Sequence, residues 1–324
     1  MVRMATELVL LGTAGAPAPV AGRAGISSAL AVDGRVFVVD CGRGAPSGYA
    51  DAGLDFARLE AVFITHLHVD HVGDLAGLLL YPWGLRAGPA GPLPPVQVYG
   101  PRRPAHLPEG DAAFHRQTTI HPELPAPGTT DLVGHLLAGY AYHLNVMPLD
   151  AAMPDPAQLV RATDITTPGL VLDDGGVRVS ACMVLHGHAA PALAYRFDTP
   201  DGSVAFSGDT TPSGDTGSDD KLIALAQGAD ILVHQVADLE YLKRHGWSGA
   251  ALDRMAGLHT DVTQVGSVAE RAGVRELILT HYLPAEPDAV SAADWVQRAS
   301  KGFSGRTVAG QDGLRRTLPA VVGQ

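Results

Sequence analysis

A run of metal-binding side chains directly after a short apolar segment is the feature that most constrains this chain. His66, His68, Asp70 and His71 lie within six residues, and they follow the apolar residues 61–65. In a strand, His66 and His68 point to the same side, and a turn after them brings Asp70 and His71 to a second position nearby. Imidazole nitrogens and carboxylate oxygens suit zinc, with iron or manganese as alternatives. A solvated histidine run would not follow a buried strand, so we interpret the segment as ligands for two adjacent metal ions.

This motif, His-x-His-x-Asp-His after an apolar strand, resembles the signature of the metallo-β-lactamase superfamily. The resemblance implies three further ligands: a histidine, a bridging aspartate and a final histidine. Residues 184–196 resemble the third motif, in which the histidine precedes a Tyr-Arg pair by seven positions, and that spacing selects His188 over His186. Asp209, in Ser-Gly-Asp-Thr, and His281, after an apolar run, match the other two.

The resemblance also implies how these residues divide the ligand positions. One metal takes His66, His68 and His188, the other takes Asp70, His71 and His281, and Asp209 bridges both together with a water-derived hydroxide. Asp70 orients this water or accepts its proton. Asp40, in Val-Val-Asp-Cys-Gly, resembles the first motif, whose aspartate supports the ligands from behind. We therefore expect two divalent metal ions as cofactors, with Zn²⁺ favoured and Mn²⁺ or Fe²⁺ as alternatives.

The segment before the last ligand narrows the family to one branch. Gly257-Leu-His259-Thr260-Asp261 is similar to a turn of the ribonuclease Z-like or arylsulfatase-like branch, in which a histidine faces the substrate phosphate. In that role His259 would donate a proton to the leaving group or stabilise charge on the reacting centre. The turn departs from the His-Ser-Thr pattern of the branch. The alternative is a helix N-cap made by Thr260 or Asp261, with His259 incidental.

Strand and helix signals indicate an α/β fold. Residues 26–32 and 35–39 match two strands joined by Asp33-Gly34, a strong hairpin signal. In the second half of the chain, helical segments alternate with buried strands, which predicts sheets covered by helices. The resemblance specifies the arrangement as a four-layer αββα sandwich.

The resemblance leaves one long stretch of the chain uncovered. We expect a single domain over residues 1–324 with an insertion at about 101–168, which contains a helix over residues 131–145. We expect this insertion to act as a lid or as a dimer contact. Relatives in the branch often form homodimers, and the same is expected here.

Charge and composition bear on location and partners. The formal net charge is −11, and only three of the 23 basic residues are lysines. Such a surface repels polyanions at long range, which disfavours nucleic acid as a partner. The apolar residues 8–11 are too few for a secretion signal or a membrane span, so we expect a cytoplasmic protein with no membrane partner. Cys41 and Cys182 form no metal-binding pair and are interpreted as small buried residues.

Three functions are compatible with this site. We favour a hydrolase that cleaves an ester-type bond in a small molecule: a phosphodiester, a sulfate or carboxylic ester, a lactone or a related electrophile. A tRNA 3′-processing endonuclease is the alternative. Against it, the arm that grips tRNA in those nucleases lies between the third-motif histidine and the bridging aspartate, where only 21 positions separate His188 from Asp209. A non-catalytic scaffold is the third, and the complete set of seven ligands disfavours it.

A second argument for a small substrate comes from the long segment between His71 and His188, which are 117 positions apart. This segment contains several aromatic and apolar residues: Trp83, Phe114, Tyr140, Tyr142 and Met147. If they roof the metals, the enclosed pocket suits a small organic substrate. The alternative is that they form the core of the insertion itself.

Overall fold

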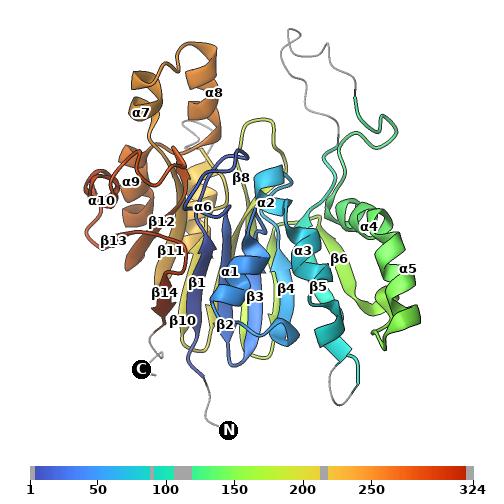
Figure 1. Cartoon of the computed structure of the whole chain (residues 1–324). Coiled ribbons are helices and arrows are strands. Elements are labelled where there is room, and N and C mark those ends of the chain that lie inside the picture. The colour runs from blue at the N-terminus through green and yellow to red at the C-terminus, as the bar shows by residue number, and fades with distance from the viewer. Residues whose placement is uncertain (1–3, 88–90, 106–118, 212–217, 319–324) are drawn as a thin grey trace.

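Two β-sheets stack face to face, and helices cover both outer faces (Figure 1). The computed structural model describes residues 4–87, 91–105, 119–211 and 218–318. Within these residues each sheet has seven strands. The predicted four-layer αββα sandwich is therefore confirmed.

The first sheet contains the strands of the N-terminal half and the last strand of the chain. Its order is β14-β1-β2-β3-β4-β5-β6. The bounds are Glu7–Gly12 for β1, Ser27–Val32 for β2, Arg35–Val39 for β3, Leu59–Phe63 for β4, Val96–Pro101 for β5, Val160–Ile165 for β6 and Arg315–Thr317 for β14. Strands β3 to β6 are parallel to one another. The loops after β3 and β4 therefore meet at one edge, and they carry Asp40 and the histidine cluster.

The second sheet has the order β13-β12-β11-β10-β9-β8-β7. The bounds are Gly169–Asp174 for β7, Val177–Val184 for β8, Ala192–Thr199 for β9, Gly202–Phe206 for β10, Ile231–Ala237 for β11, Glu276–Leu283 for β12 and Arg306–Ala309 for β13. Strands β10, β11 and β12 are parallel neighbours. Their carboxyl ends again share an edge, where Asp209 and His281 lie.

Helices pack on the outside of each sheet. On the first sheet lie α1 (Ala45–Asp51), α3 (Leu75–Leu80) and α4 (Thr129–Gly139), and on the second lie α6 (Ser218–Ala226), α9 (Val262–Ala272) and α10 (Ala292–Ala299). The remaining helices are α2 (Val69–Val72), α5 (Ala141–Asp150), α7 (Leu239–Arg244) and α8 (Ala250–Leu258), with short 3₁₀ turns at Phe56–Arg58, Trp83–Ala87 and Pro156–Gln158. Helix α9 buries Val262, Val265 and Ala269 on one side, the spacing of an amphipathic helix.

The predicted hairpin between the second and third strands is present. Asp33 and Gly34 both have positive φ, 48° and 80°, and Val32 pairs with Arg35 across the turn. Two consecutive residues with positive φ form the tight turn whose twist matches that of the flanking strands. The turn sets the register of β2 and β3 and so the position of Asp40 at the end of β3.

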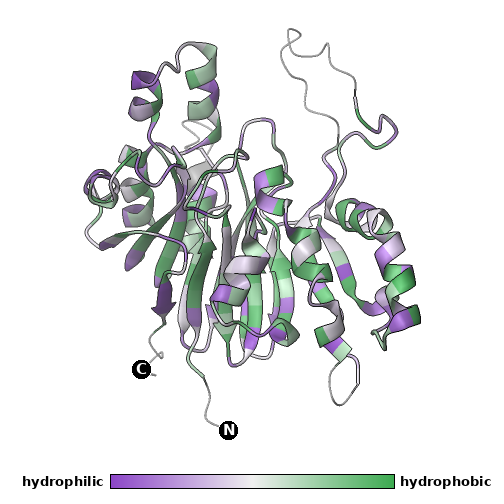
Figure 2. Cartoon of the chain, in the orientation of Figure 1, coloured by the Kyte–Doolittle hydropathy of each residue, from purple (hydrophilic) through white to green (hydrophobic). Residues whose placement is uncertain are grey.

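The space between the sheets holds the main hydrophobic core. Its largest side chains include Phe37, Phe63, Tyr195 and Phe197, all fully buried. Hydrophobic residues concentrate along the strands, whereas polar residues lie at strand ends and on outer helix faces (Figure 2). This core binds the two sheets to each other below the edge that carries the predicted ligands.

The predicted insertion is partly built into the sandwich. Strand β6 pairs with β5 and extends the first sheet, and Val133 of α4 joins the core on its outer face. The single helix expected over residues 131–145 is wrong: two helices, α4 and α5, meet at Tyr140, whose φ of −100° and ψ of 17° break the helical path. Among the described residues, no helix is long and apolar enough to span a membrane.

Candidate metal centre

The predicted histidine segment forms the transition from β4 to α2. Phe63 ends the strand, His68 is the N-cap of α2, and α2 itself carries Asp70 and His71. His66 and His71 are buried, whereas His68 faces the surface. The four residues gather with partners from the second sheet into overlapping sets whose ligand atoms lie within 4.8 Å of one another: His66, His68 and His186; His66, His71 and Asp209; Asp70, His71 and His281; His186, Asp209 and His259.

The structure places His186 in the cluster and leaves His188, the predicted third-motif residue, outside it. His186 is buried and His188 is exposed. Nε2 of His186 lies 3.2 Å from Nδ1 of His68, and its Nδ1 lies 2.8 Å from the Leu258 carbonyl oxygen. The physical reason is Gly187, whose φ of 52° turns the chain between the two histidines. That turn directs only the first of them into the cluster.

Asp209 lies at the centre of the cluster. Its Oδ2 is 3.3 Å from Nε2 of His281, 3.4 Å from Nε2 of His71 and 3.6 Å from Nε2 of His186. Gly208 places it there: its φ is 57°, and a Cβ at this position would lie 2.5 Å from the Leu193 carbonyl oxygen. A carboxylate in contact with histidines on both sides is positioned as a bridging ligand requires.

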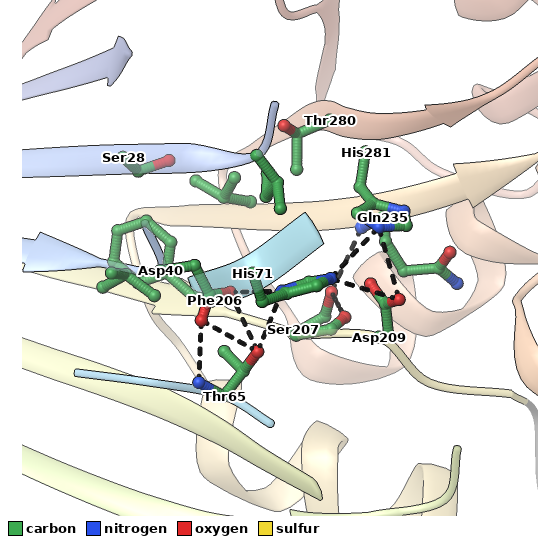
Figure 3. A pocket seen from close by; sticks show the side chains of 14 residues that line it. Ser28, Asp40, Thr65, His71, Phe206, Ser207, Asp209, Gln235, Thr280 and His281 are labelled. Atoms are coloured by element: carbon green, nitrogen blue, oxygen red, sulfur yellow. Dashed lines mark hydrogen bonds and ion pairs between the residues drawn. The ribbon is translucent and has the colours of Figure 1, made fainter. Parts of the chain in front are cut away.

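Asp40 contacts the cluster from behind, through its hydrogen bonds to Thr65 and His71 (Figure 3). One carboxylate oxygen accepts from the Thr65 backbone N–H at 2.8 Å, and the other lies 2.8 Å from Nδ1 of His71. This contact leaves Nε2 of His71 directed at Asp209. Asp40 thus fixes the orientation of the His71 ring, an arrangement similar to that of carboxylates that support metal-bound histidines.

His281 owes its direction to an irregularity in β12. Thr280 pairs with Gln235 of β11 and Tyr282 pairs with Val236, so His281 is the extra residue of a β-bulge. Its φ is 49°. Bulges redirect side chains next to functional sites, and positive φ in a non-glycine residue marks local strain. Nε2 of His281 lies 3.4 Å from Asp70 as a result.

His259 also lies beside the cluster. Its ring is held there by Gln235, a residue that no sequence motif marks. Nδ1 of His259 lies 3.9 Å from Asp209 and 3.1 Å from Oε1 of Gln235. The amide of Gln235 is oriented by its own donation to the Thr210 carbonyl oxygen at 2.8 Å. Asp261 does cap α9, by accepting from the Thr263 backbone N–H. Capping and a buried His259 beside the cluster therefore coexist.

The surroundings set most of these groups to the protonation state in which they bind metal. Burial lowers the pKa of His66 and of His186. Although burial opposes it, the hydrogen bond to His281 lowers the pKa of Asp70 to about 2. His71 is the exception: against the effect of burial, Asp209 and Asp40 raise its pKa. The raised pKa favours the protonated form of His71, with which a metal would compete.

Clefts flank the cluster on two sides. One, of about 250 Å³, runs from His68 and Asp209 to Met255 and Leu258 of α8. The other, of about 220 Å³, is lined by His66, His68, Arg102 and His188, among others. The aromatic roof expected from the insertion is absent from the lining of both clefts. Trp83 is fully buried with Leu144 and Met147 in a separate small core, Tyr142 is 81% exposed, and Phe114 lies outside the described residues.

Comparison with known proteins places this geometry in context. A model of the Metallo-beta-lactamase superfamily matches residues 22–281. A protein named Ribonuclease Z from Mycobacterium sp. (strain KMS) is 33% identical over 311 residues, which cover 94% of each chain. The Ribonuclease Z of Mycobacterium marinum is 33% identical over 308 residues, 94% of this chain and 96% of that one.

Solved structures share the fold at lower identity. The short form of human tRNase Z aligns over 97% of this chain and 99% of its own, with a TM-score of 0.60 and 19% identity. The metallo-beta-lactamase fold protein YhfI from Bacillus subtilis aligns over 96% and 99%, with a TM-score of 0.61 and 19% identity. At such identities the likeness supports the architecture alone.

Proposed function

The chain belongs to the metallo-β-lactamase superfamily and is a metal-dependent hydrolase of its ribonuclease Z-like branch, and from this premise we propose that it is an endonuclease that processes the 3′ end of precursor tRNA. The observation that carries the proposal is the identity of 33% to proteins named Ribonuclease Z across 94% of the chain. The aligned region spans nearly the whole chain, so it covers the segments that carry the site as well as the rest of the fold.

This proposal corrects two expectations from the sequence. The relatives contradict both the small-molecule substrate and the exclusion of nucleic acid. The segment between the third-motif histidine and Asp209 is too short for an RNA-binding arm. This disfavours a nuclease only if RNA has to be bound at that position of the fold. The net charge of −11 is an average over the whole surface, whereas RNA contacts only part of it.

The donors of the centre fit divalent metal ions. Nε2 of His66 and Oδ1 of Asp209 are buried and have no hydrogen-bond partner among the described residues. Buried polar atoms without partners are rare unless something else satisfies them. We propose His66, His68 and His186 for one ion, Asp70, His71 and His281 for the other, and Asp209 between them. When bound, such ions activate water and stabilise charge on phosphate oxygens.

The side chains of the chain then handle protons and orientation. Asp70, ionised because of its low pKa, orients the attacking water. Oε1 of Gln235 can only accept, so Nδ1 of His259 carries the proton of that hydrogen bond and Nε2 carries none. The proton that the attacking water releases passes to His259, whose ring lies beside Asp209. His259 then delivers this proton to the leaving 3′ oxygen as the phosphorus–oxygen bond breaks.

Several further properties are part of the proposal. Zn²⁺ is the favoured ion because five histidines and two aspartates supply nitrogen and oxygen ligands without a thiolate. We also propose a cytoplasmic homodimer and a single domain in which the insertion at 101–168 is a lid or a dimer contact. Light scattering tests the dimer directly.

The decisive experiment combines metal content with cleavage. We would measure metals per chain by elemental analysis and incubate the enzyme with a precursor tRNA that carries a 3′ extension. We expect two metals per chain and cleavage that a His68→Ala variant loses. Intact precursor tRNA in the presence of fully metallated enzyme would refute the proposed function.

A further inference from the structure

A helical hairpin lies next to the metal centre. None of the residues assigned to the proposed reaction belongs to it. Helices α7 and α8 project beyond the sandwich at the end where α2 lies (Figure 1). We propose that the tip of this hairpin binds unpaired nucleotides of the RNA substrate. The hairpin tip is defined as Tyr241, Lys243, Arg244, His245 and Trp247. This inference rests on the proposed function and names where the substrate is held.

The base of the hairpin is tied to the centre. The Leu258 carbonyl oxygen, at the end of α8, lies 2.8 Å from Nδ1 of the cluster histidine His186. The Ala256 carbonyl accepts from the Thr211 hydroxyl at 2.8 Å. At the start of α7, the fully buried Asp238 caps the helix and pairs with Arg298 of α10. The hairpin is therefore held in a defined position relative to the ligands.

The tip, in contrast, faces solvent. Residues 243–250 are all exposed, and Trp247 keeps 41% of its surface accessible. A tryptophan with this much accessible surface presents ring area on which a base can stack. The described part of the chain contains no segment that would cover it.

The chemistry of the tip matches single-stranded RNA. Tyr241 and His245 stack with their ring centroids 3.8 Å apart and an interplanar angle of 18°. Beside this stacked pair lie Lys243 and Arg244, whose positive charges suit phosphates. Aromatic surfaces on which bases stack, combined with basic side chains for the backbone, are the shared features of single-strand binding sites.

The charge of the tip differs from that of the chain as a whole. Between Glu240 and Asp253 the sequence has no acidic residue, although the protein carries a net charge of −11. A polyanion approaching this surface therefore finds a local basic segment on a molecule whose net charge is negative. This contrast favours RNA over a second copy of the same acidic chain as the occupant.

Position links the tip to the reaction. The cleft that opens from Asp209 and His259 is lined on one side by Met255 and Leu258 of α8. A strand that leaves the centre through this cleft runs along α8 toward the tip. Only 23 positions separate His186 from Asp209, too few for the arm expected there, so the hairpin supplies a grip at a different point of the fold.

The test compares charge removal with charge retention. We would measure the dissociation constant of a 3′-extended precursor tRNA by fluorescence anisotropy over a series of salt concentrations. Lys243→Ala/Arg244→Ala should weaken binding and make the slope of log affinity against log salt shallower by about two units, one for each phosphate that no longer has a basic partner. Lys243→Arg/Arg244→Lys keeps both charges and should restore binding.

Trp247→Ala should cost about tenfold in affinity if one base stacks on it, and Trp247→Phe should recover most of that loss.

The control removes two basic residues elsewhere. Arg58 precedes β4 and Arg178 lies near the start of β8, so both lie at the ends of strands opposite to the centre; Arg58→Ala/Arg178→Ala should bind like wild type. Equal affinity in the tip and control variants would overturn the inference, as would a tip variant that alters only the oligomeric state in light scattering. Wild-type enzyme that cleaves no precursor tRNA would instead count against the proposed function, and the binding constants would still decide on the tip.

Discussion

His186 and His188 lie two positions apart in opposite surroundings, which makes them a matched pair for testing the metal centre. His186 is buried beside His68, and His188 is exposed. We predict that His186→Ala lowers the metal content from two ions toward one per chain and reduces precursor tRNA cleavage by at least about 100-fold, the upper range for loss of a supporting residue. His188→Ala should keep both ions. Elemental analysis after dialysis measures the content, and a loss of metal from His188→Ala alone would reverse the assignment.

A second prediction at this scale concerns His234, which is fully buried in β11. Burial lowers its pKa to about 4. Between pH 4 and 6.5 the unfolded chain binds a proton at this residue and the folded chain does not, so stability is lost as the pH falls through that window. One proton corresponds to roughly 1 kcal/mol per pH unit. In urea titrations of metal-free protein, His234→Leu should flatten this pH dependence, whereas His135→Leu, on the exposed side of α4, should not.

Which residues gather in the cluster was predictable where the signal lies along the chain and not where it depends on how loops fold. His66, His68, Asp70 and His71 are close in sequence and are brought together in space. His188 was predicted from motif spacing. The positive φ of Gly187 turns the chain so that His186, and not His188, lies in the cluster. Gln235 carries no signal of its own. Its contact with His259 arises only because β11 ends beside β12 in a parallel sheet.

At the scale of elements, the turn from β10 to Asp209 offers a test that changes no ligand. Gly208 has φ of 57°, and a Cβ there would clash with the Leu193 carbonyl oxygen at 2.5 Å. We predict that Gly208→Ala shifts Asp209 and weakens metal binding by about 10- to 100-fold, as loss of ligand support does. Gly228 is the control, because its φ is 65° and a Cβ added there would meet no atom within 4 Å.

Titration of both variants with a competing chelator measures the effect on metal binding. Gly228→Ala carries the same backbone strain, so it should lose stability in thermal melts but keep its metal affinity. If both variants bound metal equally, the close approach of Gly208 to Leu193 would have no part in positioning Asp209.

Elements with strong local signals were predicted well. The Asp33-Gly34 turn and its two strands appear as expected, because the turn chemistry and the alternating pattern agree. The helix predicted over residues 131–145 instead breaks at Tyr140. The bulge at His281 had no counterpart in the apolar pattern of β12. Breaks and bulges are set by packing between elements, which periodicity alone does not contain.

At the scale of the whole molecule, the centre joins the two halves of the sandwich. His66, His68, Asp70 and His71 follow strands of the first sheet, whereas His186, Asp209 and His281 come from the second. Ions held by both groups would connect the sheets at the edge, above the core formed by residues such as Phe63 and Phe197. The core itself contains none of the ligands, so the fold does not depend on metal for its hydrophobic burial.

Metal removal should therefore lower stability without unfolding the chain. Ligands that bind only the folded state add about 4 kcal/mol when their free concentration is about 1,000 times the dissociation constant, and at about 2 °C per kcal/mol this predicts a melting temperature lower by roughly 8 °C after chelation. Circular dichroism melts with and without a chelator measure the shift, and added Zn²⁺ should restore it. In His186→Ala the shift should shrink, because one ion then loses one of its two ligands from the second sheet and keeps only Asp209. A chelator that leaves the wild-type melting temperature unchanged would show that no metal links the two sheets.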